Sequence, residues 1–385
     1  MIIPQKYLAV NWADGMKVNK SHFINNENYY TDTIRDMASV QLNNYNYGLL
    51  PSLEGGEAAL SKFTVSKTTT NQVQIHISRL QAVTPGGVRI SILNDLTSVH
   101  SLSDFSNVKT DLLDGTKEEF YVLITVNPFE QIPFGSPDPE EVPIRQPQTQ
   151  PKYEIQLVNA KNVNVDQLGG YILVIGRIIK QGESYLKDED FIAPCTTINS
   201  DAKLISQYIS VGRCFNELQN MSLQIIQKIL FKNQQSKVAQ NVKLMCETVL
   251  NFCNQNYFYF RNIGTQQAPI FLVNAISIFS NYLYTAINIL PENEKEELLN
   301  YFFEWSDVTP INFQNSLAGI IEINYNHYKT GSYLHEIQIM LNNVVLIWQK
   351  LNMLEFIGQH KENIVVKQEV LTHVVKEKKG WSILD

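Results

Sequence analysis

The residues best suited to chemistry are few and lie far apart in the sequence. The tightest acidic cluster is Asp188, Glu189 and Asp190, and carboxylates of this kind bind divalent cations. The cluster precedes Phe191 and Pro194, as is typical of a linker, and lacks the patterned spacing of a calcium-binding loop. The sequence therefore favours a solvated acidic loop, with a cation site as the alternative.

Histidine and cysteine, the other common metal ligands and nucleophiles, show no functional spacing. His327 and His335 lie eight residues apart, too far to share a metal on one helix face. The four cysteines form no CxxC pair, and the nearest two, Cys246 and Cys253, lie seven apart in a helical pattern. We expect reduced, mostly buried thiols.

The local motifs of common enzymes are also missing from the sequence. It contains no P-loop, GxGxxG, HExxH or GxSxG pattern, and its paired glycines are typical of turns. We therefore expect no catalytic residue, no metal ligand and no cofactor, although a triad assembled from distant positions would leave no motif.

Composition narrows the class of protein further. A net charge of −7 and no compensating basic block disfavour a nucleic-acid binder. The N-terminus does not have the pattern of a signal peptide. Uninterrupted apolar runs such as residues 171–175 are far shorter than the about 20 residues of a membrane span. The sequence predicts a cytoplasmic protein with no direct membrane insertion, and its 385 residues suggest two or three domains.

Periodicity predicts an α+β multidomain architecture that begins with a lead and a helix in residues 1–45. Asn19 or Ser21 is expected to cap this helix. One helical face collects mostly apolar residues, namely Phe23, Tyr30, Ile34, Met37 and Gln41.

Residues 46–195 are predicted to form an antiparallel β-sandwich or barrel, because apolar residues alternate in several short runs. Pro85-Gly86-Gly87 predicts a hairpin between residues 73–78 and 88–92, and Asp114-Gly115 predicts a second turn. Residues 128–151 contain seven prolines. We expect them to form a long extended loop that either lies on the surface or reaches a neighbour.

Residues 196–355 are predicted to form an all-α bundle of four to six helices. Two interleaved heptad rows run through its first helix: Leu204, Val211, Leu218 and Ile225, with Tyr208, Phe215, Ser222 and Ile229. Similar patterns occur at 269–290 and 334–351. Residues 356–385 are polar with repeated valine pairs, and are expected to form a short hairpin or remain loose.

The N-terminal lead carries a motif that resembles the opening of TssK proteins, baseplate subunits of bacterial type VI secretion systems. Its members are Trp12, Gly15, Met16, His22 and Phe23, with Lys20-Ser21 where the family usually has Pro-Gln. Further motifs follow in family order: Tyr47-Gly48-Leu49, Thr84-Pro85-Gly86-Gly87, Asp190 to Pro194, Ala268-Pro269 with Leu283, and Tyr325-Asn326-His327. The resemblance covers roughly residues 8–353.

The resemblance implies a phage receptor-binding-protein-like β-sandwich shell at 46–195, a helical neck at 196–355 and assembly as a homotrimer. It implies that the shell docks onto the subunits TssF and TssG through the lead motif. In a three-fold neck, Tyr208, Phe215 and Ile229 would face neighbouring copies, the alternative being packing within the chain. Residues 356–385 are expected to be a short tail or a remnant of the family's head domain, since they are too few for that domain. Such a divergent chain resembles the systems of Bacteroidetes, so the membrane-complex partner stays open.

The resulting functional hypothesis is a non-catalytic structural adaptor that links TssF and TssG to the membrane-anchoring complex. The alternative is a phage-tail-like receptor-binding or carbohydrate-binding trimer, which would usually expose Trp or Tyr on its β-domain. Trp305, Trp348 and Trp381 instead lie outside that domain. A hydrolase on a β-sandwich is a third possibility.

Overall fold

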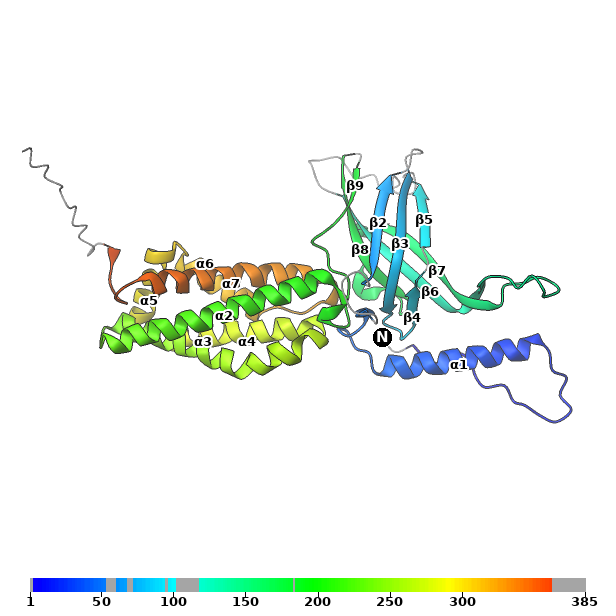
Figure 1. The fold of residues 1–385 in the computed structure, drawn as a ribbon, viewed down its shortest axis with the longest axis horizontal. Coiled ribbons are helices and arrows are strands. Elements are labelled where there is room, and N and C mark those ends of the chain that lie inside the picture. Colours follow the sequence, from blue (N-terminus) through cyan, green and yellow to red (C-terminus); the bar gives the residue numbers. More distant parts are fainter. Residues whose placement is uncertain are drawn as a thin grey trace, which may run out of the picture.

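The computed structural model describes residues 3–52, 60–67, 72–93, 96–101, 118–182 and 184–361. The molecule is elongated, with a β-sheet shell at one end and a helical neck at the other (Figure 1). Helix α1 (Lys20–Val40) lies along the outside of the shell. The predicted turn at Asp114-Gly115 and the valine pairs of the tail lie outside the described residues.

Two antiparallel sheets build the described part of the shell. In the first, β3 (Gln72–Val83) pairs with four strands: β1 (Gly48–Leu49), β2 (Lys62–Lys67), β4 (Arg89–Ile92) and β5 (Leu96–Ser101). The second has the order β7-β6-β8-β9, made of β7 (Gln148–Asn159), β6 (Glu118–Phe134), β8 (Ile172–Gln181) and β9 (Ser184–Lys187). The predicted antiparallel β-domain is confirmed.

Alternation decides which side chains enter the sandwich. Val73, Ile75 and Ile77 are fully buried while their neighbours along β3 are partly exposed. The predicted hairpin is confirmed, because β3 and β4 pair from Val83 with Arg89 onward around the turn.

The proline-rich segment differs from the expected loop. β6 and β7 continue into it as a two-stranded ribbon, in which Gln131 pairs with Pro151 and Pro133 with Thr149. Pro128 lies in the register shift just before Gln131, where no ladder hydrogen bond is required of it. Residues 135–147 alone join the two strands without strand structure. The prediction overlooked that a ribbon with open edges tolerates proline.

Six α-helices build the neck within the described residues: α2 (Ala202–Phe231), α3 (Lys237–Asn262), α4 (Pro269–Asn288), α5 (Glu292–Ser306), α6 (Pro310–Ile321) and α7 (Thr330–Met353). Their starts follow from local chemistry. Asp201 and Thr309 accept backbone N–H bonds at the starts of α2 and α6, and Pro269 opens α4.

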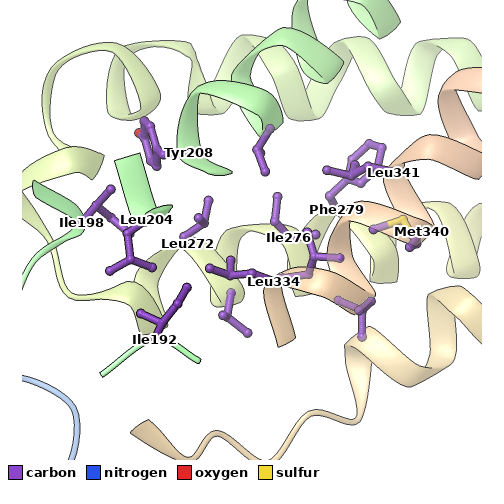
Figure 2. Close-up of a cluster of buried hydrophobic side chains, with 14 of the residues drawn as sticks. Ile192, Ile198, Leu204, Tyr208, Leu272, Ile276, Phe279, Leu334, Met340 and Leu341 are labelled. Carbon is purple, nitrogen blue, oxygen red and sulfur yellow. The ribbon is translucent and has the colours of Figure 1, made fainter. Parts of the chain in front are cut away.

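The neck core is built from the predicted heptad rows. Leu204, Leu272, Ile276 and Leu334 come from three helices and meet in one buried cluster (Figure 2). Ser222 interrupts the seam of α2 for a reason: its Oγ accepts a 2.8 Å hydrogen bond from Nε1 of the buried Trp348.

One described helix, α4, is long and apolar enough to cross a membrane by length and composition alone. No uninterrupted apolar run marks it, because asparagine and serine divide its sequence. Half of the window concerned is buried inside the bundle. Core helices of proteins that never enter a membrane pass the same test.

Candidate interaction surfaces

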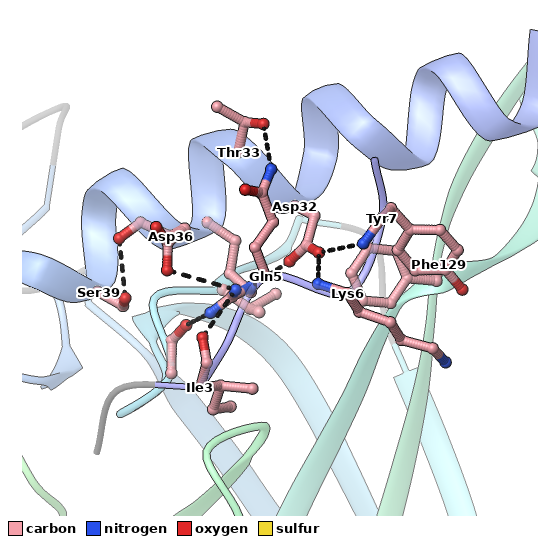
Figure 3. A network of polar contacts seen from close by, with 12 residues as sticks. Ile3, Gln5, Lys6, Tyr7, Asp32, Thr33, Asp36, Ser39 and Phe129 are labelled. Atoms are coloured by element: carbon pink, nitrogen blue, oxygen red, sulfur yellow. Dashed lines mark hydrogen bonds and ion pairs between the residues drawn. The ribbon is translucent and has the colours of Figure 1, made fainter. Parts of the chain in front are cut away.

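A buried polar network fixes the N-terminal lead and α1 onto the shell (Figure 3). Asp32 and Arg35 of α1 are 1% and 3% exposed and form an ion pair of 2.8 Å. Asp32 accepts hydrogen bonds from the backbone N–H groups of Lys6 and Tyr7, and Arg35 donates to the carbonyl of Ile3 at 3.0 Å. The lead is therefore tied down along the inner face of the helix.

The charge of Asp32 depends on these partners. Burial alone would raise its pKa, but the N–H groups of Tyr7 and Lys6 and the guanidinium of Arg35 outweigh burial and hold the pKa below its usual value. The carboxylate thus stays ionised at neutral pH inside the protein. A buried charge of this kind would be strongly unfavourable without its partners. Loss of one partner therefore destabilises the whole network.

Close backbone packing brings α1 against the β3–β4 turn. Gly87 has a φ of +85°, and a Cβ there would lie 2.5 Å from the carbonyl oxygen of Arg35. Arg35 also donates to the carbonyl of Gly86 at 3.4 Å. Glycine is thus required for the turn and for the approach of the helix.

The apolar face of α1 consequently points to solvent. The periodicity was identified correctly, but Phe23, Tyr30, Ile34 and Met37 are 56–69% exposed, and the buried residues of the helix are polar. We call these four residues the outer face of α1. An apolar helix face of this size without a cover is typical of an interaction surface.

The predicted lead residues continue this surface. The ring of Trp12 lies 6.1 Å from that of His22 and 6.5 Å from that of Phe23, and half of the Trp12 side chain is exposed. Gly15, with a φ of +79°, and Met16 belong to the turn that leads back to α1. The Nδ1 of His22 accepts from the N–H of Asn19, which caps the helix. Trp12, His22 and Phe23 therefore lie together, and the turn positions them.

The side chains predicted to form a seam in the neck are not exposed, as a contact between copies would require. Tyr208, Phe215 and Ile229 are 1–7% exposed inside the bundle of a single chain. The hydroxyl of Tyr208 donates to the carbonyl of Phe260. The ring centroids of Phe215 and Phe252 lie 5.0 Å apart. These side chains are unavailable to a second copy. Both heptad rows of α2 face one core, so the alternative, packing within the chain, accounts for them.

Several motifs that lie far apart in the sequence meet where the shell joins the neck. The N–H of Leu49 donates to the carbonyl of Pro194 at 2.7 Å, and a Cβ on Gly48 would overlap that oxygen at 2.0 Å. His327 bonds to the carbonyl of Tyr47 at 3.0 Å and to the hydroxyl of Tyr325 at 2.9 Å. Burial lowers the pKa of His327 to about 4, so the ring is neutral. These residues fix the junction rather than perform chemistry.

The acidic cluster and the thiols also have structural surroundings. Asp188 is buried and pairs with Arg177 at 2.5 Å, and the exposed Glu189 pairs with Lys203 at 3.1 Å. Within the described residues no group of three or more His, Cys, Asp or Glu side chains is placed to hold a metal. Burial raises the pKa of Cys246 and of Cys253 to about 12, which leaves both thiols protonated and unreactive.

The fold defines a class of protein: an antiparallel β-shell with an outer helix, joined to an elongated helical neck. No protein-family model matches the chain, and no curated protein matches it. Among solved structures it is similar to a crystal structure of TssK, with a TM-score of 0.50 at 14% identity over 86% of this chain and 68% of that chain. It is also similar to a chain of the baseplate complex from the type VI secretion system, with a TM-score of 0.51 at 12% identity over 89% and 99% of the two chains. The fold is therefore that of TssK.

Proposed function

We propose that this chain is a non-catalytic structural adaptor of a type VI secretion baseplate. One of the structures with the same fold is a chain of such a baseplate complex. The observation that carries the proposal is the outer face of α1 together with Trp12, because the protein holds this apolar surface toward solvent with a buried ion pair. Such an arrangement serves docking rather than the stability of the isolated chain.

We assign the docking partners from the resemblance of the lead motif to TssK proteins: TssF and TssG bind at the outer face of α1 and at Trp12, His22 and Phe23. The chain acts in the cytoplasm as a homotrimer, and the neck points toward a membrane-anchoring complex whose contact is not assigned. The ionisable groups described above form ion pairs and hydrogen bonds that hold elements of the fold together. This structural use supports a role without catalysis.

Co-purification tests this function directly. The tagged full-length chain is expressed with TssF and TssG of the same genome, and all three are expected in one complex. Trp12→Ala and Phe23→Ala should each lower the yield of TssF and TssG, since both side chains are half exposed and support no core. Leu186→Ser, an exposed position on β9 of the shell, is the matched control. Failure to capture TssF and TssG, or equal capture by all variants, would contradict the proposal.

A further inference from the structure

A cavity of about 280 Å³ opens to solvent between α2 and α3, which lie side by side in the neck (Figure 1). Its walls are mostly aromatic and come from Phe215 of α2 and from Phe252, Tyr257 and Phe260 of α3. The ring centroid of Phe215 lies 5.0 Å from that of Phe252 and 5.4 Å from that of Phe260. An apolar cavity of about 150 Å³ already holds a benzene molecule. The cavity between α2 and α3 therefore has room for a large aromatic side chain.

One of the residues that line this cavity is a glycine that the packing of the chain does not require. Gly212 lies in the interior of α2, where glycine is less favourable than alanine. Apart from the backbone of its own helix, a Cβ at Gly212 would meet no heavy atom within 4 Å. The missing side chain keeps the cavity open, because a larger residue at this position would project into it.

The rim of the cavity carries a positive charge. Among the ten lining residues only Arg261 is charged. Its Nη1 donates to the hydroxyl of Tyr257 at 3.1 Å, and among the residues that the structure describes no carboxylate forms an ion pair with it. Since a guanidinium has five N–H donors in a planar fork, Arg261 retains donors for a carboxylate from outside the chain.

A larger cavity beside the junction of shell and neck has a different character. It measures about 450 Å³, and Arg177, Lys203 and Glu189 are among its lining residues. These charges are already paired within the chain, Arg177 with Asp188 and Lys203 with Glu189. An apolar wall with a few polar groups, as found between α2 and α3, is instead the composition of a binding pocket.

We propose that the cavity between α2 and α3, which we call the α2–α3 pocket, binds a segment of a partner protein that presents an aromatic side chain next to an aspartate or glutamate. The aromatic ring occupies the space over Gly212 and packs on Phe215 and Phe252, and the carboxylate accepts hydrogen bonds from Arg261. Aromatic side chains seated in pockets contribute much of the binding energy of protein–protein contacts. The inference does not depend on the proposed function, because it concerns a different surface.

The apolar surface around the pocket favours a peptide segment over a free small molecule. Ile209 and Leu223 lie at helical spacing from Gly212 and Asn216 on α2, and with Phe258 of α3 they are 45–67% exposed. Residues 209–223 of α2 extend over about 21 Å. An amphipathic helix of about 15 residues matches this length, with its aromatic anchor in the pocket and further apolar side chains on Ile209 and Leu223.

Peptide selection on the full-length protein tests the inference. Random peptides of about 15 residues are displayed on phage and selected on the wild-type protein, after removal of those that bind Gly212→Leu, in which the new side chain occupies the pocket. The enriched peptides should share an aromatic residue with an aspartate or glutamate close to it in sequence. Gly212→Leu should melt at a temperature no lower than that of the wild type, since leucine favours a helix more than glycine does.

Fluorescence anisotropy of a selected peptide, made synthetically, then measures the role of Arg261. Arg261→Gln, or replacement of the carboxylate of the peptide by its amide, should weaken binding about fivefold, which is the size of one exposed ion pair. The two changes together should weaken binding no further, because they remove the same contact. Gly319→Leu is the matched control, since Gly319 is a helix glycine of α6 with open space around it and lies outside the pocket.

Several results would overturn the inference. They include a selection that leaves no peptide, enriched peptides without an aromatic or an acidic residue, unchanged affinity for Arg261→Gln, and a lowered melting temperature of Gly212→Leu. A lower mass of Gly212→Leu than of the wild type in light scattering would also overturn it, because the occupant would then be a second copy of the chain. If indole-3-acetate displaced the peptide at the concentration of the peptide itself, a free aromatic acid would suffice and the partner segment would be refuted.

Discussion

The orientation of α1 depends on Arg35, so Arg35→Met is the most informative single change in the shell. The variant keeps the volume of the side chain but leaves the carboxylate of Asp32 buried, with backbone N–H groups as its remaining donors. Breaking a buried ion pair on one side costs about 3–5 kcal/mol. The carbonyls of Ile3 and Gly86 also lose a donor. We expect a loss of about 4 kcal/mol in the stability of the unit formed by the lead, α1 and the shell.

Hydrogen exchange and denaturant unfolding of the full-length protein measure this loss. The amides of Lys6 and Tyr7, which donate to Asp32, and the amides of α1 should exchange much faster, while amides of α2 and α7 stay protected. Arg145→Met is the matched control, because Arg145 pairs with Glu141 at an exposed site worth at most about 1 kcal/mol. Adding Asp32→Asn to Arg35→Met should recover part of the stability. A loss no larger than that of Arg145→Met would refute the role given to the ion pair.

Three further predictions concern the docking surface and the junction. The double change Ile34→Ser and Met37→Ser should weaken the binding of TssF and TssG by about 100-fold, because two-thirds of each side chain is exposed in the free chain and its burial in the complex would contribute about 3 kcal/mol in all. Pull-down titration measures this affinity, and an unchanged affinity would contradict the prediction. Because the pKa of His327 is lowered to about 4, its neutral form stabilises the fold above pH 6.5, and this stabilisation is lost as the pH falls from 6.5 toward 4. Melting curves should show a loss of about 2.5 kcal/mol at pH 4.5 that His327→Gln reduces, and an equal pH dependence in the variant would contradict the assignment. Gly48→Ala should destabilise the junction by about 3 kcal/mol or more, since Gly48 has a φ of +112° and no room for a Cβ; a melting temperature equal to that of the wild type would count against this strain.

Local patterns predicted much of the fold. Alternation located the strands of β3 and β4, and heptads located α2, α4 and α7, because burial on one face leaves a period in the sequence. The proline-rich segment was predicted less well. Proline excludes a central strand, but the strand partners that make an open ribbon of β6 and β7 are distant in the sequence.

The direction in which an apolar helix face points was harder to predict than the periodicity of that face. The apolar face of α1 was recognised, but its exposure depends on contacts with residues 3–7 and the β3–β4 turn, which no local pattern reveals. The same ambiguity affected Tyr208, Phe215 and Ile229, whose heptad spacing suits an internal core and a contact between chains equally well.

The most direct test of the central claim is oxidative footprinting of the chain alone and in a reconstituted mixture with TssF and TssG. Met37, Tyr30 and Trp12 are exposed and readily oxidised, so they report on the outer face of α1 and on the lead. The adaptor account predicts that these three residues become protected in the complex, while Met353, exposed at the far end of the neck, keeps its reactivity. Equal oxidation of Met37, Tyr30 and Trp12 with and without TssF and TssG would contradict it.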